Sequence, residues 1–343
     1  MTSTLKFKLV VALLISVHGV IALGGFFAPY DSTTQNRDFP YAPPMRLHFV
    51  DPSAGWSLRP FVYGLKEVAG NPDQYEEDKA QRYPLQFFLR GSAYSIAGMF
   101  SSSLHLFGVR EPGRVFLLGV DGLGRDQFSR LLVGGQISLL AGILATLLSL
   151  LVGTAMGAAA GFFGKWTDES VMRLTDLFLA LPWLYLLLAV RAFLPLSITP
   201  LRAFLLIITV IGIVGWARPA RLVRGVVLSA RERRFVTAAR GFGATPWYLL
   251  KRHILPQAGY VLLIQAAVLI PQYVLAEVTL SFVGLGVAEP VPSWGNMLAN
   301  LQQYHVLVSY WWMYLPAFAL VPVSLGYFLL ANSLQDRAAA SAL

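Results

Sequence analysis

The chain has 343 residues, of which 56% are apolar and 13% charged, against roughly 25% charged in a typical soluble domain. Its formal net charge is +9 and it contains no cysteine, which excludes disulfides and thiolate metal sites. The five histidines show no metal-ligand spacing, and no Gly-x-x-x-x-Gly-Lys-[Ser/Thr] phosphate-binding motif occurs. We therefore expect a polytopic membrane protein that binds neither metal nor ATP on its own.

Six apolar runs approach or exceed the length of about 20 residues that a membrane-spanning helix needs. They are Leu9–Phe27, Ile137–Phe163, Leu177–Leu194, Ala203–Ala217, Gly259–Phe282 and Tyr310–Leu330. The first run could be a retained span or a cleaved signal peptide, and its length favours the span. The runs predict an all-α polytopic membrane protein with six transmembrane helices.

A long polar segment, residues 29–118, separates the first two spans. From Asp31 through Arg130 the chain carries eleven basic and eleven acidic side chains, so this region has no positive bias. Segments with a surplus of Lys and Arg resist translocation, and this one has none. We predict a periplasmic insertion that forms a small subdomain, because 90 residues are too many for a plain connector.

Residues 119–136 follow as a turn-rich segment with glycines at 119, 122 and 124. Phe128, Leu131 and Leu132 provide a short apolar face, which favours a helix lying in the membrane interface.

Two features of the spans point to packing or function. Gly153, Gly157 and Gly161 recur every fourth residue, so they share one helix face and allow another helix to approach closely. Glu277 is an acid near the end of the fifth span, where an unpaired charge in hydrocarbon costs about 3 kcal/mol. We expect Glu277 to have a partner or to face the transport pathway; the alternative is a helix-end residue that reaches the interface.

The stretch Arg218–Gln257 holds nine basic side chains and a single acid, Glu232. Such a loop between spans should face the cytoplasm. Nucleic-acid binding is a poorer explanation of the charge, because the surplus is confined to this one loop. Counting six spans from an internal N-terminus also places residues 164–176, 218–257 and 331–343 inside.

Within this loop, Arg231 to Lys251 predicts two short helices that meet near Gly243, where glycine permits a turn with positive φ. Ala238, Ala239 and Gly243 form a small-residue face suited to docking on a cytoplasmic partner. Binding to anionic lipid headgroups would explain the charge but not these small residues. Pro256 is expected in the first turn of the fifth span, where its missing N–H is harmless.

Two long segments resemble the dipeptide, oligopeptide and nickel permease family of ABC transporters. FVTAARGFGATPWYLLKRHILPQ (235–257) is similar to the family's EAA loop, and AEVTLSFVGLGVAEPVPSWGNML (276–298) to its LSFLGLG…P…P.WG segment. FLLGVDGLGRDQFSR (116–130) looks like the LGTDxxGRDxxSR segment of the second permease subunit.

The resemblance implies a type I ABC importer permease fold in a bacterial cytoplasmic membrane. It also implies that the basic loop carries a coupling helix for an ATPase; the residues carried over are Thr237, Ala238, Ala239, Arg240, Gly243, His253, Leu255 and Pro256. Thr237 stands where the motif usually has Glu. The implied partners are a second permease in a heterodimer, two ATP-binding subunits that hold ATP and Mg, and an extracytoplasmic substrate-binding protein.

The predicted organisation has five parts. They are an N-terminal transmembrane helix (1–28), the periplasmic insertion (29–118), an interfacial segment (119–136), a five-helix permease core (137–333) with its coupling loop (218–257), and a cytoplasmic tail (334–343).

A self-sufficient secondary carrier is the alternative, but such carriers usually need intramembrane ionisable groups or repeated halves. A membrane-bound enzyme ranks third, because no nucleophile–base or metal constellation supports it. Peptide is the substrate class that the resemblance favours; nickel complexes and glycosides remain open.

Overall fold

The computed structural model describes residues 3–51, 55–68, 70–96, 100–180, 182–192 and 199–342. The chain divides into two compact units. The helical unit comprises Met1–Leu14, Leu139–Leu280 and Pro322–Leu343, and the mixed unit comprises Ile15–Ser138 and Ser281–Val321. The boundaries fall inside four long helices, namely α1 (Ser3–Ala22), α3 (Gln127–Phe163), α10 (Leu255–Phe282) and α13 (Leu315–Ala342).

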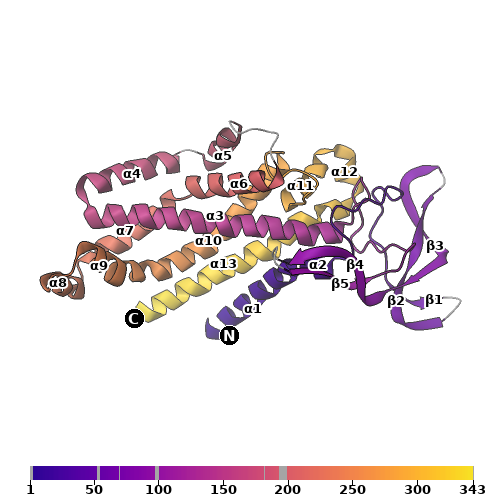
Figure 1. Ribbon diagram of the computed structural model, residues 1–343, viewed down its shortest axis with the longest axis horizontal. Helices are drawn as coiled ribbons and strands as arrows, with labels where there is room; N and C mark the ends of the chain where they lie inside the picture. The colour runs from indigo at the N-terminus through magenta and orange to yellow at the C-terminus, as the bar shows by residue number, and fades with distance from the viewer. Residues whose placement is uncertain are drawn as a thin grey trace. The chain divides into compact units, whose positions relative to one another are not determined.

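The helical unit also contains a series of shorter helices (Figure 1). They are α4 (Lys165–Ala180), α5 (Trp183–Ala192), α6 (Pro200–Val214), α7 (Ala217–Arg231), α8 (Arg234–Gly241), α9 (Pro246–Leu249) and the π-helical turn η1 (Leu250–Ile254). Figure 1 shows α8 and α9 together at one end of this unit, beyond α7. The predicted loop Arg218–Gln257 is therefore mostly helical.

Within the described residues, four helical stretches are long and apolar enough to cross a membrane: Leu5–Ala22, Gln127–Phe163, Pro246–Phe282 and Trp311–Ala340. A fifth is possible if α6 and α7, which meet at a bend of 44°, form one broken span. This supports a multi-pass membrane protein. The six spans predicted from the sequence are not all present as single helices.

The larger difference lies in the third predicted span, Leu177–Leu194, while the fourth, Ala203–Ala217, is a candidate span only when α6 is joined to α7. There α4 ends at Ala180 and α5 begins at Trp183, with Pro182 outside both helices. Proline lacks a backbone N–H and its ring clashes with the preceding turn, so it either kinks or ends a helix. Parts of this run, residues 181 and 193–198, lie outside the described residues. Residues 165–176, which the span count leaves as a connection between two spans, form most of α4.

The mixed unit contains two antiparallel sheets. One has the order β1 (His48–Asp51), β2 (Gly55–Val68), β3 (Asn71–Pro84), and the other pairs β4 (Gln86–Ile96) with β5 (Phe100–Gly108). The register pairs Phe61 with Pro84 and Gln86 with Gly108. The remaining helices of this unit are short: α2 (Gly24–Phe27), α11 (Trp294–Ala299), η2 (Asn300–Gln302), α12 (Tyr304–Ser309) and η3 (Trp311–Tyr314).

The prediction of an all-α protein is therefore wrong. Residues 48–108 form strands because short apolar groups recur within polar sequence, and these groups bury against one another when strands pair. Val62, Leu85, Phe107, Val109 and Val115 form such a buried core. Each apolar group is too short to span a membrane, so the apolar runs of the sequence give no sign of these strands.

The interfacial helix expected within 119–136 is also absent as a separate element. Helix α3 begins at Gln127 and continues without a break to Phe163. The apolar residues that suggested an interfacial helix belong to the first turns of this long helix.

Candidate functional site

The turn at Gly243 joins α8 to α9 and confirms the two short helices predicted there. Gly243 has φ +83°, a conformation that glycine adopts without steric cost. The Ala244 N–H donates to the Ala239 carbonyl at 3.1 Å, and the Gly243 N–H donates to the Arg240 carbonyl at 3.0 Å. These two bonds form a Schellman C-cap, which closes the end of α8 with a fixed geometry.

A hydrophobic core fixes the α8–α9 segment to the rest of the helical unit. Val236 of α8 and Leu249 of α9 are buried, and they belong to one cluster with residues of α3, α7 and η1. The other buried members are Ala158, Val223, Val227, Ala230, Leu250 and Ile254. A force applied to α8 or α9 therefore acts directly on α7.

The small-residue face expected from the sequence is divided. Ala239 is half-buried and packs against this core, whereas Ala238, Arg240 and Gly243 are exposed. A Cβ added at Gly243 would meet no atom within 4 Å. The surface available to a partner thus includes Ala238 and Gly243 but only the edge of Ala239.

Exposed aromatic side chains surround the same turn. Phe242 is 91% exposed and Trp247 is 69% exposed, and Tyr248 is also exposed. Large aromatic groups that are exposed in a free subunit are common anchors of protein interfaces. Sequence reasoning overlooked these residues because aromatic side chains are also frequent in membrane spans.

Thr237 is exposed and lines a hollow of about 520 Å³ together with Glu232 and Arg240. Its Oγ1 donates to the Arg233 carbonyl at 3.4 Å, so the hydroxyl bonds its own helix. Thr237 stands where the family motif usually has Glu. Glu232, the single acid of the basic stretch, therefore lines the same hollow as Thr237.

The remaining motif residues lie where α9 passes into α10. His253 is half-buried, with its ring centroid 6.0 Å from that of Phe235 and 5.5 Å from that of Tyr248. Leu255 packs against the hydrophobic core, and Pro256 is in the first turn of α10, directly after the π-helical turn η1.

Ion pairs between α4 and α7 neutralise part of the basic stretch. Arg224 binds Asp168, with Nη2 2.6 Å from Oδ2, and Arg221 binds Asp176. The Arg224 guanidinium holds the pKa of Asp168 below its usual range. Helix α4 is thereby attached to α7 at two points.

Most other cations of the stretch are unneutralised. Within the described part of the chain, six of its basic side chains have no hydrogen bond or ion pair: Arg218, Arg233, Arg234, Arg240, Lys251 and Arg252. Five of them lie in or beside α8, α9 and η1, so this surface combines aromatic groups with uncompensated positive charge.

The three glycines of α3 lie where α3 packs closely against α7. A Cβ on Gly157 would come within 2.2 Å of the Ala220 carbonyl oxygen, and one on Gly153 within 2.6 Å of Pro219. At Gly161 the Arg224 carbonyl would be 2.9 Å away. Any larger residue would separate the two backbones, and α7 carries the α8–α9 segment.

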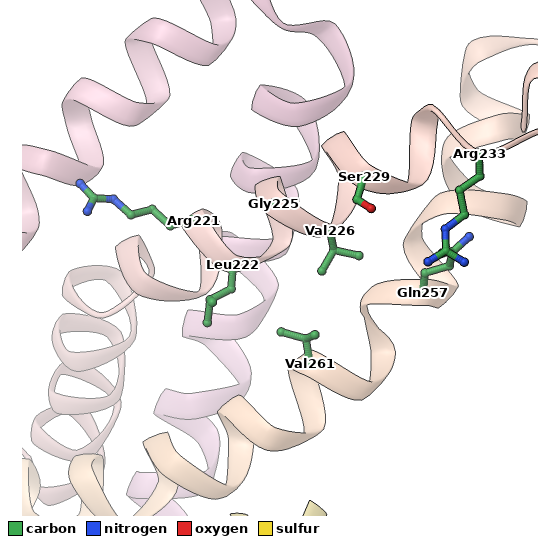
Figure 2. Close-up of a pocket in the computed structure, with 8 residues that line it drawn as sticks. All are labelled: Arg221, Leu222, Gly225, Val226, Ser229, Arg233, Gln257 and Val261. Carbon is green, nitrogen blue, oxygen red and sulfur yellow. The ribbon is translucent and has the colours of Figure 1, made fainter. Parts of the chain in front are cut away.

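A second hollow lies between α7 and α10, and Arg233 at the start of α8 borders it (Figure 2). Its volume is about 510 Å³, and Figure 2 shows Leu222 and Val226 of α7 facing Val261 of α10 across it. Gly225 borders it with open space at its Cβ position.

Glu277 is fully buried within the described chain, at 0% exposure. Its side chain is therefore surrounded by protein and does not contact lipid.

An ion network in the mixed unit, buried except at Glu289, was missed by the sequence reasoning. Arg125 contacts Asp121 at 2.7 Å and Glu289 at 2.6 Å, and Arg130 contacts Glu289 at 2.9 Å. Arg130 is 0% exposed. These residues belong to the GVDGLGRDQFSR segment and to the loop after α10, so the network fixes two distant parts of the chain to each other.

Residues 149–339 match the family described as binding-protein-dependent transport system inner membrane component. The glutathione transport system permease protein GsiD of Pectobacterium atrosepticum is 34% identical over 225 residues, which cover 66% of this chain and 72% of that protein.

Two relatives from Bacillus subtilis are similar over the same region. The oligopeptide transport system permease protein OppC is 34% identical, covering 66% of this chain and 72% of its own length. The dipeptide transport system permease protein DppC is 32% identical, covering 66% of this chain and 68% of its own length. The resemblance inferred from the motifs is confirmed, and the chain belongs to the family of inner membrane components of binding-protein-dependent transport systems.

Proposed function

We propose that this chain is one of two permease subunits of an ATP-binding-cassette importer for short peptides in a bacterial cytoplasmic membrane. Two cytoplasmic subunits bind ATP and Mg, and an extracytoplasmic protein delivers the substrate. Peptide is the proposed cargo because relatives that match 66% of the chain are described as oligopeptide, dipeptide and glutathione permeases.

The observation that carries the proposal is the α8–α9 segment. It is short and capped, it bears exposed Phe242 and Trp247, and a buried core attaches it to α7. A rigid protrusion of this kind fits a cleft in another protein better than a lipid surface. The uncompensated cations around it favour a cleft that is acidic at its rim, because complementary charge speeds association.

The proposed mechanism follows from how this segment is attached. When the ATP-binding subunits close, they move α8 and α9, and the shared core transfers the movement to α7. Helix α7 meets α6 at a bend of 44°, so a displacement of α7 can change the angle between the two helices. Such a change alternately opens and closes the path between the two permeases.

The test uses two substitutions on the exposed surface. Ala238→Trp adds bulk where a partner would contact α8, and overpacking of a close interface costs about 1–3 kcal/mol. Gly243→Val forces a β-branched residue to positive φ, where such residues are outliers. Both variants should reach normal membrane levels, because no span is altered, yet copurify with less ATP-binding subunit and lose uptake.

Gly243→Asn is the matched control, since asparagine tolerates positive φ and the position is open. It should retain most of the uptake. If Ala238→Trp and Gly243→Val both keep full ATPase association and full uptake, the segment does not couple the two subunits and the proposal fails.

A further inference from the structure

A cavity in the helical unit contains polar groups that no role has yet explained. Its volume is about 460 Å³, and it lies where the end of α4, the bend between α6 and α7, and the middle of α10 meet. Arg218 and Gln272 line it together with apolar side chains such as Phe178, Ile211 and Leu269. Cavities of this size are typical of small-ligand sites, in which a few polar groups stand among apolar walls.

The tyrosine at this cavity is already engaged. The Tyr273 hydroxyl is 3.0 Å from Ser149 Oγ and donates to the Gly215 carbonyl at 3.3 Å. A Cβ on Gly215 would lie 1.9 Å from that hydroxyl, so Tyr273 fixes the bend between α6 and α7. Arg218 and Gln272 are the groups left to meet a ligand.

Arg218 differs from the next two arginines of α7. Arg221 and Arg224 both bind carboxylates of α4, whereas the Arg218 side chain has no ion pair or hydrogen bond with any described residue. A guanidinium pairs best with a carboxylate, which it can hold through two parallel hydrogen bonds. The cavity therefore offers an anion site with an unused cation.

The polar groups of the cavity indicate that it faces water and not lipid, with Gln272 deep in the membrane and Arg218 at the cytoplasmic end of the predicted fourth span, Ala203–Ala217. Gln272 lies ten residues before the end of α10 at Phe282, which is about 15 Å along a helix. That is about half of the ~30 Å hydrocarbon core. Ionisable and polar groups at such depth almost always face a bundle interior or a water-filled pathway.

We propose that Arg218 and Gln272 form a carboxylate-binding subsite on the transport path, which holds the C-terminal carboxylate of a peptide in transit. The Arg218 guanidinium donates two hydrogen bonds to the carboxylate, the Gln272 amide donates a further one, and the apolar walls contact the last side chains of the peptide. The identity of the cargo rests on the proposed function; the anion site does not.

The anion site is tested by cysteine modification in the complete transporter, since this chain has no native cysteine. Leu275→Cys places an exposed thiol in the cavity lining. An anionic methanethiosulfonate, the sulfonatoethyl reagent, should modify it about tenfold faster than the cationic trimethylammonium reagent. Adding Arg218→Gln should abolish the preference, and Arg218→Lys should keep part of it.

Arg202→Gln is the matched control, because it removes an exposed cation of α6 that does not line the cavity. It should leave the preference unchanged. If neither reagent modifies the thiol, or if the preference survives Arg218→Gln, the subsite does not exist.

Protection of the same thiol identifies the ligand. Trialanine and propionate, which carry a free carboxylate, should slow modification, and trialanine amide should not. If alanyl-glutamyl-alanine amide protects the thiol and trialanine does not, the recognised carboxylate is not the C-terminal one. Protection by propionate alone would uphold the anion site and contradict the peptide cargo. Protection by trialanine amide as strong as that by trialanine would exclude the carboxylate as the recognised group.

Discussion

Asp126 precedes α3 and is almost completely buried. Its Oδ2 accepts hydrogen bonds from the Ser129 N–H at 2.8 Å and from Ser129 Oγ at 2.6 Å, which caps the start of α3. Burial nonetheless raises the pKa of Asp126 to about 6, because desolvation opposes the charged form more than the capping bonds favour it. The folded protein thus binds this proton more tightly than the unfolded chain does.

Asp126 should therefore make the stability of the protein pH-dependent. Its stabilising contribution is present at low pH and falls as the pH rises from about 4 to about 6, after which it is constant. Asp126→Asn keeps the shape and removes the titration. We expect the melting temperature of the wild type relative to this variant to fall by a few degrees between pH 5 and pH 7. A difference that does not change with pH would show that Asp126 titrates normally.

The ion network around Glu289 explains why residue-level reasoning failed in the mixed unit. Arg125 and Glu289 are 164 residues apart, and nothing in either local sequence points to the other. The motif GVDGLGRDQFSR indicated a special segment through its glycines. Three of its charged residues, Asp121, Arg125 and Arg130, form ion pairs with one another or with Glu289, so they stabilise the fold.

Among the elements, the α8–α9 turn was predictable and the strands were not. A glycine between two short helical patterns specifies the turn locally, and Gly243 adopts the positive φ that was expected. The strands of residues 48–108 depend on pairing between distant segments, so their apolar groups carry no strong period. The interruption of the third predicted span depends on whether Pro182 kinks or ends a helix, which neighbouring packing decides.

The contact between α3 and α7 provides the clearest prediction for an element. Gly157→Ala places a methyl group against the Ala220 backbone carbonyl, which cannot rotate away. We expect it to destabilise the protein by about 1–3 kcal/mol and to lower the melting temperature of the complex by several degrees.

Gly225→Ala is the matched control. It makes the same substitution in α7, at a glycine whose added Cβ would meet no atom within 4 Å. It should be neutral or stabilising, because alanine favours helix over glycine by about 0.5–1 kcal/mol. Equal melting temperatures for Gly157→Ala and wild type would mean that α3 and α7 are not close-packed at this point.

For the whole molecule, the charge distribution predicts which segments lie on each side of the membrane. Residues 29–118 should be outside, and Arg218–Gln257 should be inside. Ser101→Cys in β5 and Ser229→Cys in α7 both place a thiol at an exposed position. An impermeant maleimide applied to intact cells should label Ser101→Cys and leave Ser229→Cys unlabelled until the cells are opened. The reverse pattern would invert the topology.

The central claim is that α8 and α9 bind an ATP-binding subunit. Cross-linking in intact membranes tests it most directly, with a photoreactive amino acid in place of Phe242, whose side chain is 91% exposed. The same amino acid in place of Phe318 of α13, which is also exposed, serves as the control. We predict that illumination joins position 242 to a subunit that binds ATP, and that position 318 gives no such product. If position 242 cross-links only to lipid, or not at all, while the complex still hydrolyses ATP, energy coupling does not pass through this turn.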